Sequence, residues 1–238
     1  IIDSCNYGIF YESSSRVLST VSNARILIKN CTFISVKNAL YLSLISNKLA
    51  LQNNTIVNCS NLDNIDNKLS VIRIKICSTA SLVFDHFIFK NNKYLQPKTS
   101  TTGFGGGIGL NIINSDNTKR TFYLEFNACE FYSNEATDGE PNHRENHYSG
   151  GVLYYTNDDK ISISSLSFST CTFIDNYAVG KGGAIYIETG TNSLISIFNC
   201  SFILNRADND AAAVFVKNRY NFNLESSQFI NNTVSQST

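Results

Sequence analysis

Acidic residues gather at two places where they could act on a substrate. Inverting glycoside hydrolysis needs two carboxylates facing each other across a cleft, and Asp158-Asp159 is an adjacent pair. A calcium-dependent lyase needs clustered carboxylates beside a base. The residues that could form such a cluster are Asp175, Arg206, Asp208 and Asp210. Because Asp is common in turns, we interpret the pair as turn residues and the cluster as an exposed mixed-charge corner, and we assign no catalytic residue.

Histidine and cysteine are the residues that could bind a transition metal. His143 and His147 are four positions apart, a spacing that binds zinc when it lies on a helix. The same segment contains Gly139 and Pro141, which favour a surface loop. The chain has seven cysteines, but no two have the C-x-x-C spacing of many zinc sites. We therefore predict neither a metal site nor a cofactor.

One motif recurs along the chain, and its clearest copy is LSFSTCTFIDN at residues 166–176. It reads apolar-x-apolar-x-x-Cys-x-Phe-x-x-Asn. The residues aligned at its Phe position are Phe33, Ile56, Phe89, Phe131, Phe173, Phe202 and Phe229. We align a partial copy at the start of the chain, at Ile2, Cys5 and Tyr7. Internal repeats of this length are typical of solenoids, propellers and arrays.

The spacing inside the motif predicts a bend. Leu166 and Phe168 are two residues apart, so both face the same side of a strand. Cys171 and Phe173 are also two apart. The step of three between the two pairs would put them on opposite sides of a straight strand. A chain that keeps both pairs inward must therefore turn a corner between them.

A third apolar run follows each motif, as at residues 184–187 and 213–216, and we predict three strands per coil. The expected fold is all-β, with residues 1–238 forming one single-stranded parallel β-helix segment of about seven to eight coils. A β-propeller is the alternative architecture. It needs hairpin turns, and Asp138-Gly139 is the one Asn-Gly or Asp-Gly dipeptide in the chain.

Residues that share a motif position should stack on successive coils. We predict a ladder of buried thiols, with disulfides as the alternative, because free Cys behaves as a small buried hydrophobe. Its members are Cys5, Cys31, Cys129, Cys171 and Cys200. The Asn that ends the motif predicts a second ladder, because its side-chain amide both donates and accepts hydrogen bonds. Its members are Asn92, Asn134, Asn176, Asn205 and Asn232, and Val36 and Cys59 stand at this place nearer the start.

Two polar insertions widen the middle coils. The repeat is 23 positions long from Phe33 to Ile56 and 42 from Phe131 to Phe173. Loops on a rigid scaffold commonly carry function. We therefore expect carbohydrate, or a surface protein of a host or partner, to bind through the insertions. They are residues 93–104 and 135–149.

The composition bears on partners and context. The 238 residues carry 19 Lys+Arg and 19 Asp+Glu, and without basic runs nucleic acid is disfavoured. No apolar run approaches about 18 residues, so we predict no membrane-spanning helix. The chain lacks Met and opens in mid-repeat, and we expect a fragment of a longer protein that continues into further β-helix repeats.

Five N-x-[S/T] sequons occur in the chain. Many such sequences arise by chance in a chain rich in Asn and Ser, but they could carry glycans in a secreted eukaryotic protein. The sequon residues are Asn30, Asn53, Asn58, Asn199 and Asn231.

FIDN at residues 173–176 followed by GGAI at residues 182–185 resembles the paired FxxN and GGAI motifs of the chlamydial polymorphic outer-membrane protein repeats. The FxxN half also matches at Phe89, Phe131, Phe202 and Phe229, whereas the GGAI half is intact once. The resemblance covers residues 84–234, and the first 60 residues depart from it. It implies a right-handed, pectate-lyase-like parallel β-helix, exposed on the cell surface and adhesive.

Two functions remain as hypotheses. The first is a non-catalytic segment of a secreted or cell-surface protein, used for adhesion or as a structural stalk. The alternative is a polysaccharide lyase or glycoside hydrolase acting on acidic polysaccharide. Arg73-Ile74-Lys75 resembles the RIK element of polygalacturonases, but in that family it follows an Asp pair and a Gly-His-Gly element. Here it precedes Asp158-Asp159, and there is no Gly-His-Gly.

Overall fold

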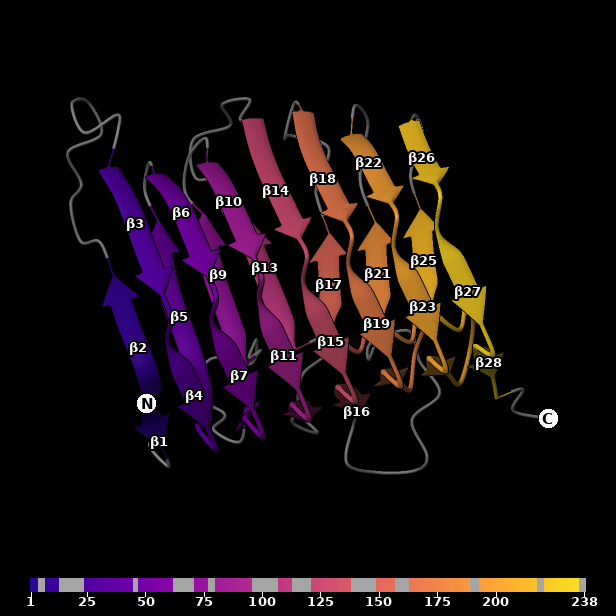
Figure 1. Cartoon of the computed structure of the whole chain (residues 1–238), viewed down its shortest axis with the longest axis horizontal. Helices are drawn as coiled ribbons and strands as arrows, with labels where there is room; N and C mark the ends of the chain where they lie inside the picture. Colours follow the sequence, from indigo (N-terminus) through magenta and orange to yellow (C-terminus); the bar gives the residue numbers. More distant parts are fainter. Residues whose placement is uncertain are drawn as a thin grey trace.

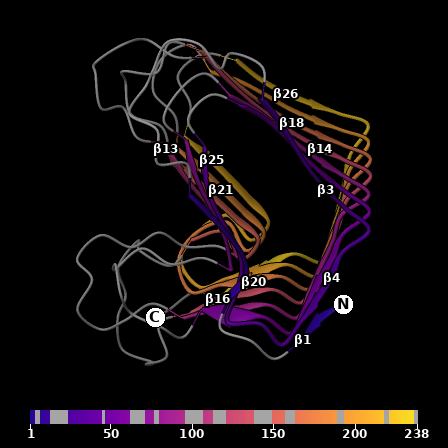
Figure 2. The ribbon, with the colours of Figure 1, turned by 90° about the vertical axis from the view of Figure 1, so that its left-hand side faces the viewer.

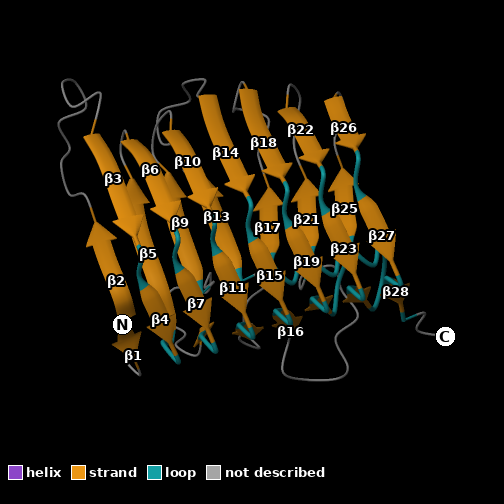
Figure 3. Cartoon of the chain, viewed as in Figure 1, coloured by secondary structure: helices purple, strands orange, loops and turns teal. Residues whose placement is uncertain are grey.

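A computed structural model describes most of the chain as β-strands joined by short bends. The described residues are 1–3, 7–12, 24–44, 47–61, 71–76, 80–95, 107–112, 121–137, 149–156, 163–188, 193–217 and 221–235. Figure 3 shows the strands in orange and the connecting bends in teal. Within these ranges no helix has the length and apolar character needed to cross a membrane.

The strands form four sheets, here called sheets A to D. Sheet A contains β1 (Ile2–Asp3), β4 (Thr32–Ile34), β7 (Thr55–Val57), β11 (Ile88–Lys90), β15 (Glu130–Tyr132), β19 (Thr172–Ile174), β23 (Ser201–Ile203) and β27 (Gln228–Ile230). Sheet B contains β2 (Tyr7–Glu12), β5 (Asn38–Leu44), β9 (Ile72–Ile76), β13 (Ile108–Ile112), β17 (Leu153–Thr156), β21 (Ile185–Glu188) and β25 (Val214–Lys217). Sheet C contains β3 (Ala24–Lys29), β6 (Asn47–Gln52), β10 (Ala80–Asp85), β14 (Thr121–Asn127), β18 (Ile163–Ser169), β22 (Ser193–Phe198) and β26 (Asn221–Glu225). Sheet D contains β8 (Ser60–Asn61), β12 (Lys93–Leu95), β16 (Glu135–Thr137), β20 (Tyr177–Ala178), β24 (Arg206–Ala207) and β28 (Thr233–Val234).

The chain visits sheets C, A, D and B in turn, and each circuit stacks on the one before (Figure 1). Every pairing between described strands is parallel, which excludes the hairpins of a propeller. Seen from the N-terminal end, the chain runs clockwise as it recedes (Figure 2). The molecule is therefore a right-handed parallel β-helix. Counted over the described residues, its sheets have eight, seven, seven and six strands, which agrees with the predicted seven to eight coils.

The predicted three strands per coil is wrong, because sheet D adds a fourth. Its strands are two or three residues long and begin directly after the Asn that ends the motif, or after Cys59 in the case of β8. Each of the later ones contributes a single small apolar side chain to the interior, as at Ala136, Ala178 and Ala207, all fully buried. A strand that contributes one small residue leaves no apolar periodicity to detect.

The predicted insertions also begin too early. Their first three residues, Lys93–Leu95 and Glu135–Thr137, are strands β12 and β16, which pair with each other in sheet D. The rest of the first insertion, and residues 138–148 of the second, lie outside the described residues. Ser149 closes the second insertion and is fully buried, with its hydroxyl accepting from the Lys181 backbone N–H at 2.9 Å.

The predicted bend is made by a residue in the left-handed region of backbone conformation, here called a corner residue. Thr170 has φ 56° and Asp175 has φ 54°, and they flank the short strand of sheet A. Such a residue changes the chain direction and lets the next side chain point inward. The equivalent residues between sheets C and A are Asn30, Asn53, His86, Ala128, Thr170, Asn199 and Ser226. Those between sheets A and D are Ser35, Asn58, Asn91, Ser133, Asp175, Leu204 and Asn231.

The Phe residues of the motif stack along the axis of the solenoid. The Phe173 ring lies 4.7 Å from Phe131 and 4.7 Å from Phe202, measured between ring centroids. All three side chains are fully buried. Phe229 continues the stack, 4.7 Å from Phe202, but is 45% exposed because it lies in the last described coil. The predicted inward stack is confirmed.

The Asn residues that directly follow the bend residues between sheets A and D form the predicted second ladder. Asn176 donates from Nδ2 to Asn205 Oδ1 at 2.9 Å and to the Phe131 carbonyl at 3.1 Å. Its own Oδ1 accepts from Asn134, at 3.1 Å from the backbone N–H and 2.9 Å from Nδ2. Each amide is thus fully bonded inside the core, which removes the penalty for burying it.

A cysteine can replace this Asn. The backbone N–H of Cys59 donates to Asn92 Oδ1 at 2.9 Å, so Cys59 is the next member of the Asn ladder. Its Sγ accepts from the Val36 N–H at 3.4 Å, where an Asn would use Oδ1. The sulfur is a weaker acceptor, but it leaves no backbone group of Val36 unpaired.

The alignment of the opening copy is wrong. Ile2 pairs with Phe33 in sheet A, so it stands at the Phe position of the motif. The predicted alignment relied on Cys5, which lies outside the described residues. Because Cys occurs at both corners, as Cys59 shows, a single Cys does not determine the register.

The glycine pairs make a tight return into sheet B. Gly182 has φ +65°, which disfavours any side chain. A Cβ on Gly183 would lie 2.2 Å from the Ala212 carbonyl oxygen, so the neighbouring coil leaves no room for one. Gly150 and Gly151 repeat both features one coil earlier.

We predict that Phe173→Ala destabilises the protein by about 3–5 kcal/mol, because it opens a cavity in a stack with neighbours on both sides. The matched control is Phe229→Ala, whose ring is half exposed and stacked on one side only, and we expect about 1–2 kcal/mol. Denaturant unfolding of both variants measures the difference. Equal losses would contradict an interior stack.

The Asn ladder predicts an unusual order of substitutions. Asn176→Ala should cost at least about 3 kcal/mol, because it leaves buried groups of Asn134 and the Phe131 carbonyl unpaired. Asn176→Cys should cost about 1 kcal/mol less than Asn176→Ala, since a thiol can accept the Asn134 N–H as Cys59 accepts that of Val36. Denaturant unfolding tests this order. If Asn176→Cys is no more stable than Asn176→Ala, the corner does not work through an acceptor.

Candidate binding surface

The acidic cluster considered for calcium binding does not converge on one point. Asp175 accepts a hydrogen bond from Ser133 Oγ at 3.2 Å, on the exposed corner between sheets A and D. Asp210 forms an ion pair with Lys181, with Oδ2 and Nζ 3.6 Å apart. Across the described ranges, no three His, Cys, Asp or Glu side chains lie close enough to hold a metal ion.

The other two members of that cluster, Asp208 and Arg206, contact a tyrosine on sheet D. The Tyr177 hydroxyl donates to Asp208 Oδ2 at 2.7 Å, and the Arg206 guanidinium lies 5.3 Å from the centre of the Tyr177 ring. Burial and the bond to Asp208 raise the pKa of the Tyr177 phenol. Each charge is thus held by its own neighbour, as the exposed mixed-charge interpretation predicts.

The remaining candidates from the sequence cannot be placed as a group. Asp158-Asp159, His143 and His147 lie outside the described residues. Arg73-Ile74-Lys75 lies in β9 of sheet B, where Ile74 is fully buried. Arg73 pairs with Gly109 of β13.

The cysteine ladder is built as predicted where it is described. Cys129 and Cys171 are almost fully buried, and their thiols donate to carbonyls of the preceding coil at 3.4 and 3.3 Å. A hydrogen bond with Cys129, together with burial, raises the pKa of the Cys171 thiol to about 12. A hydrogen bond with Cys171, and burial, raise the pKa of the Cys200 thiol even more strongly. These residues are thiols, not disulfides.

We predict that Cys129, Cys171 and Cys200 react with a thiol reagent only when the protein unfolds, because all three side chains are buried and a reagent cannot reach them in the core. Labelling followed by mass spectrometry should show their modification rates tracking global unfolding. Cys31 is partly exposed and serves as an internal reference that reacts first. Rapid native labelling of all three would contradict the inward ladder.

The outer face of sheet B carries a row of stacked aromatic rings, which the sequence analysis did not identify. Tyr154 stacks on Tyr186 and Tyr186 on Phe215, with ring centroids 5.0 Å apart in both pairs and planes within 6°. Their neighbours along the strands, such as Leu153 and Ile185, are fully buried in the core. Because side chains alternate along a strand, the three rings lie on the outer side of the sheet. Tyr186, in the middle of the stack, is only 7% exposed, whereas Tyr154 and Phe215 at its ends are partly exposed.

A charged row runs beside these rings. Glu188 accepts a hydrogen bond from the Tyr186 hydroxyl at 2.8 Å and forms an ion pair with Lys217. The bond from Lys217 holds the pKa of the Glu188 carboxyl below its ordinary value. Burial and the Glu188 charge raise the pKa of Tyr154 to about 12. We call Tyr154, Tyr186, Phe215, Glu188 and Lys217 the aromatic face.

The insertions are attached next to the aromatic face. Both leave from paired strands of sheet D, and the strands that follow them, β13 and β17, pair in sheet B through Ile108 with Leu153 and Gly109 with Tyr154. The anchor points therefore lie one coil apart. Tyr154 follows the return of the second insertion by five residues from Ser149.

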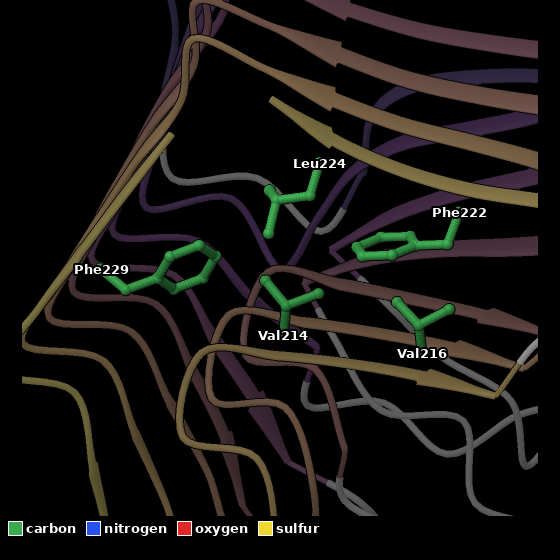
Figure 4. A pocket seen from close by; sticks show the side chains of 5 residues that line it. All are labelled: Val214, Val216, Phe222, Leu224 and Phe229. Atoms are coloured by element: carbon green, nitrogen blue, oxygen red, sulfur yellow. The ribbon is translucent and has the colours of Figure 1, made fainter. Parts of the chain in front are cut away.

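A hollow of about 330 Å³ at the C-terminal end is the open interior of the last described coil (Figure 4). The residues lining it are Val214, Val216, Phe222, Leu224 and Phe229. Phe222 is 48% exposed, whereas Ile195, its partner one coil earlier, is fully buried. None of the five lining residues has a polar side chain to orient a small ligand, so the aromatic face is the better candidate site.

The aromatic face was hidden in the sequence by the core beneath it. In the run VLYY at residues 152–155, outward and inward positions are both apolar, so no alternation appears. The signal that could have revealed it is the pairing of Tyr154 with Tyr186 at the same offset after a glycine pair.

Comparisons with known proteins agree with the sequence resemblance. No protein-family model and no solved structure matches the chain. Over 135 residues, 54% of this chain, the sequence is 30% identical to a protein described as probable outer membrane protein PmpG of Chlamydia muridarum. The match spans 13% of that protein's length. This chain is thus similar, over about half its length, to a small part of a probable outer membrane protein.

Proposed function

We propose that this chain is a non-catalytic β-helical segment of a secreted or cell-surface protein, and that it binds another surface through the aromatic face and the insertions beside it. The partner is a carbohydrate or a protein of the opposing surface. The solenoid carries this face and, as a rigid stack of coils, also serves as a stalk.

The observation that supports this most directly is the aromatic face. Tyrosine and aromatic residues are enriched where proteins contact partners, because they combine a large contact area with a polar group and lose little entropy. The face also has Glu188 and Lys217 in a row beside the rings. The motif residues, by contrast, are buried in the core, where a partner cannot contact them. The similarity to an outer-membrane protein supports the location.

The enzyme alternative has less support. A hydrolase needs two carboxylates that act on one bond, and a calcium-dependent lyase needs carboxylates clustered beside a base. Among the described residues, Asp175, Asp208 and Asp210 each bond to a different neighbour, and they lie on a mixed-charge surface.

The proposal is tested with beads coated with the full chain and applied to cultured cells. We expect adhesion, and we expect a combined Tyr154→Ser and Lys217→Ser variant to reduce it about tenfold, since truncating a central contact costs about 1–2 kcal/mol. The matched control is Tyr123→Ser, which removes a tyrosine that is 43% exposed on sheet C.

Periodate oxidation of the cells separates the two partner classes, because it destroys surface sugars and leaves most protein contacts intact. Loss of adhesion after oxidation identifies carbohydrate, and unchanged adhesion identifies protein. If the chain does not adhere, or if Tyr123→Ser reduces adhesion as much as the variant of the aromatic face, the proposal is wrong.

A further inference from the structure

All five sequon asparagines occupy the same structural position. Each is a corner residue with φ between 50° and 56° and an exposed side chain. The residues are Asn30, Asn53 and Asn199 between sheets C and A, and Asn58 and Asn231 between sheets A and D. The residue after each one points into a ladder of the core, and the Ser or Thr after that begins a strand. A group attached to the Asn would therefore extend away from the core.

The corner geometry explains the Asn but not the Ser or Thr. Asn tolerates the left-handed region better than most residues. Among the fourteen corner residues of the described chain, six are Asn, and five of these six have Ser or Thr two positions later. Asn91, followed by Lys93, is the exception.

Among the eight other corner residues, only Thr170 has a Ser or Thr two positions later, at Thr172. If the strand start alone favoured a hydroxyl, it would do so equally after every corner residue. The hydroxyl instead accompanies Asn, and the amide and hydroxyl of one sequon do not bond to each other in the described structure. The pairing therefore points to a requirement other than folding.

We propose that the five sequon asparagines carry N-linked glycans, an inference that rests on the secreted or surface location in the proposed function. The sequon is the acceptor for this modification. The Asn side-chain nitrogen attacks the anomeric carbon of a lipid-linked oligosaccharide pyrophosphate, forms a C–N bond, and loses a proton. The C–O bond to phosphate breaks, and the lipid pyrophosphate leaves.

The glycans would line the two ridges that border sheet A. Figure 2 shows these ridges on the side of the solenoid away from the outer face of sheet B. The aromatic face lies on sheet B and not beside these ridges, so its partly exposed rings, Tyr154 and Phe215, would not be covered. The modification would thus shield one side of the solenoid and leave the aromatic face open for contact.

Spacing along the ridges determines which sites are occupied together. Asn30 and Asn53 are neighbours on adjacent coils, and Asn53 Nδ2 donates to Asn30 Oδ1 at 3.3 Å. Coils are about 4.8 Å apart, too close for two glycans side by side, so this pair carries one. Asn58, Asn199 and Asn231 have no sequon at the same corner of the adjacent described coils, and we expect all three to be modified.

The first test uses the chain isolated from the cells that make it. An amide-cleaving glycosidase converts each glycosylated Asn to Asp, and peptide mass spectrometry reads the conversion. We expect Asp at Asn58, Asn199 and Asn231, and at one of Asn30 and Asn53 in any one molecule. Unmodified Asn at 58, 199 and 231 would overturn the proposal without bearing on adhesion.

The second test uses matched variants of the full chain secreted from cultured eukaryotic cells. Thr233→Val removes the sequon of Asn231 and should lose one glycan, seen as a faster band that glycosidase treatment makes equal to wild type. Thr172→Val is the matched control. Thr172 is also the first residue of a strand and lies two positions after a bend residue, but that residue is Thr170 and not Asn, so this variant should lose no glycan. The unfolding midpoint should change equally little in both deglycosylated variants. Identical glycan counts for wild type and Thr233→Val would contradict the assignment of Asn231.

Discussion

The structure depends on a backbone constraint, a residue held at φ near +50° on each side of the short strand of sheet A. Most side chains avoid this conformation, at a cost of about 1 kcal/mol or more per residue. It persists here because the corner N–H groups bond to the next coil in every described coil but the last, as Thr170 does to the Phe198 carbonyl at 3.0 Å. Because of the bend, the inward pair before it and the inward pair three positions after it face the same interior.

The ladders follow from that bend. Directly after each corner residue, the chain places a side chain where it meets its equivalents on the coils above and below. Such a position must be apolar or must complete its own hydrogen bonds. Asn176 satisfies this condition through bonds to Asn134, Asn205 and a carbonyl, and Cys171 satisfies it with a carbonyl of the preceding coil. The motif residues are therefore explained by the requirements of the fold, and functional residues must be sought on the outer faces of the sheets.

Much of the scaffold could be predicted from the sequence, because residues such as Phe173 and Asn176 repeat at a spacing that geometry can interpret. Sheet D could not, since a strand that buries only Ala178 has no periodicity. The register of Ile2 was misassigned because Cys fits both corners. The aromatic face escaped notice because Tyr154 lies between two core residues that are themselves apolar. Outward apolar residues on a fully apolar strand become visible only when the register between coils is known.

Cross-linking between adjacent coils tests the stacked register most directly. Glu130 pairs with Thr172 in sheet A, with side chains outward on neighbouring strands. The double variant Glu130→Cys with Thr172→Cys should oxidise to a disulfide, because neighbouring Cα atoms about 4.8 Å apart lie within disulfide range. Tyr132→Cys with Thr172→Cys is shifted by two residues, which separates the Cα atoms by more than about 7 Å, and should stay reduced. A disulfide in the shifted pair, with none in the aligned pair, would contradict the account.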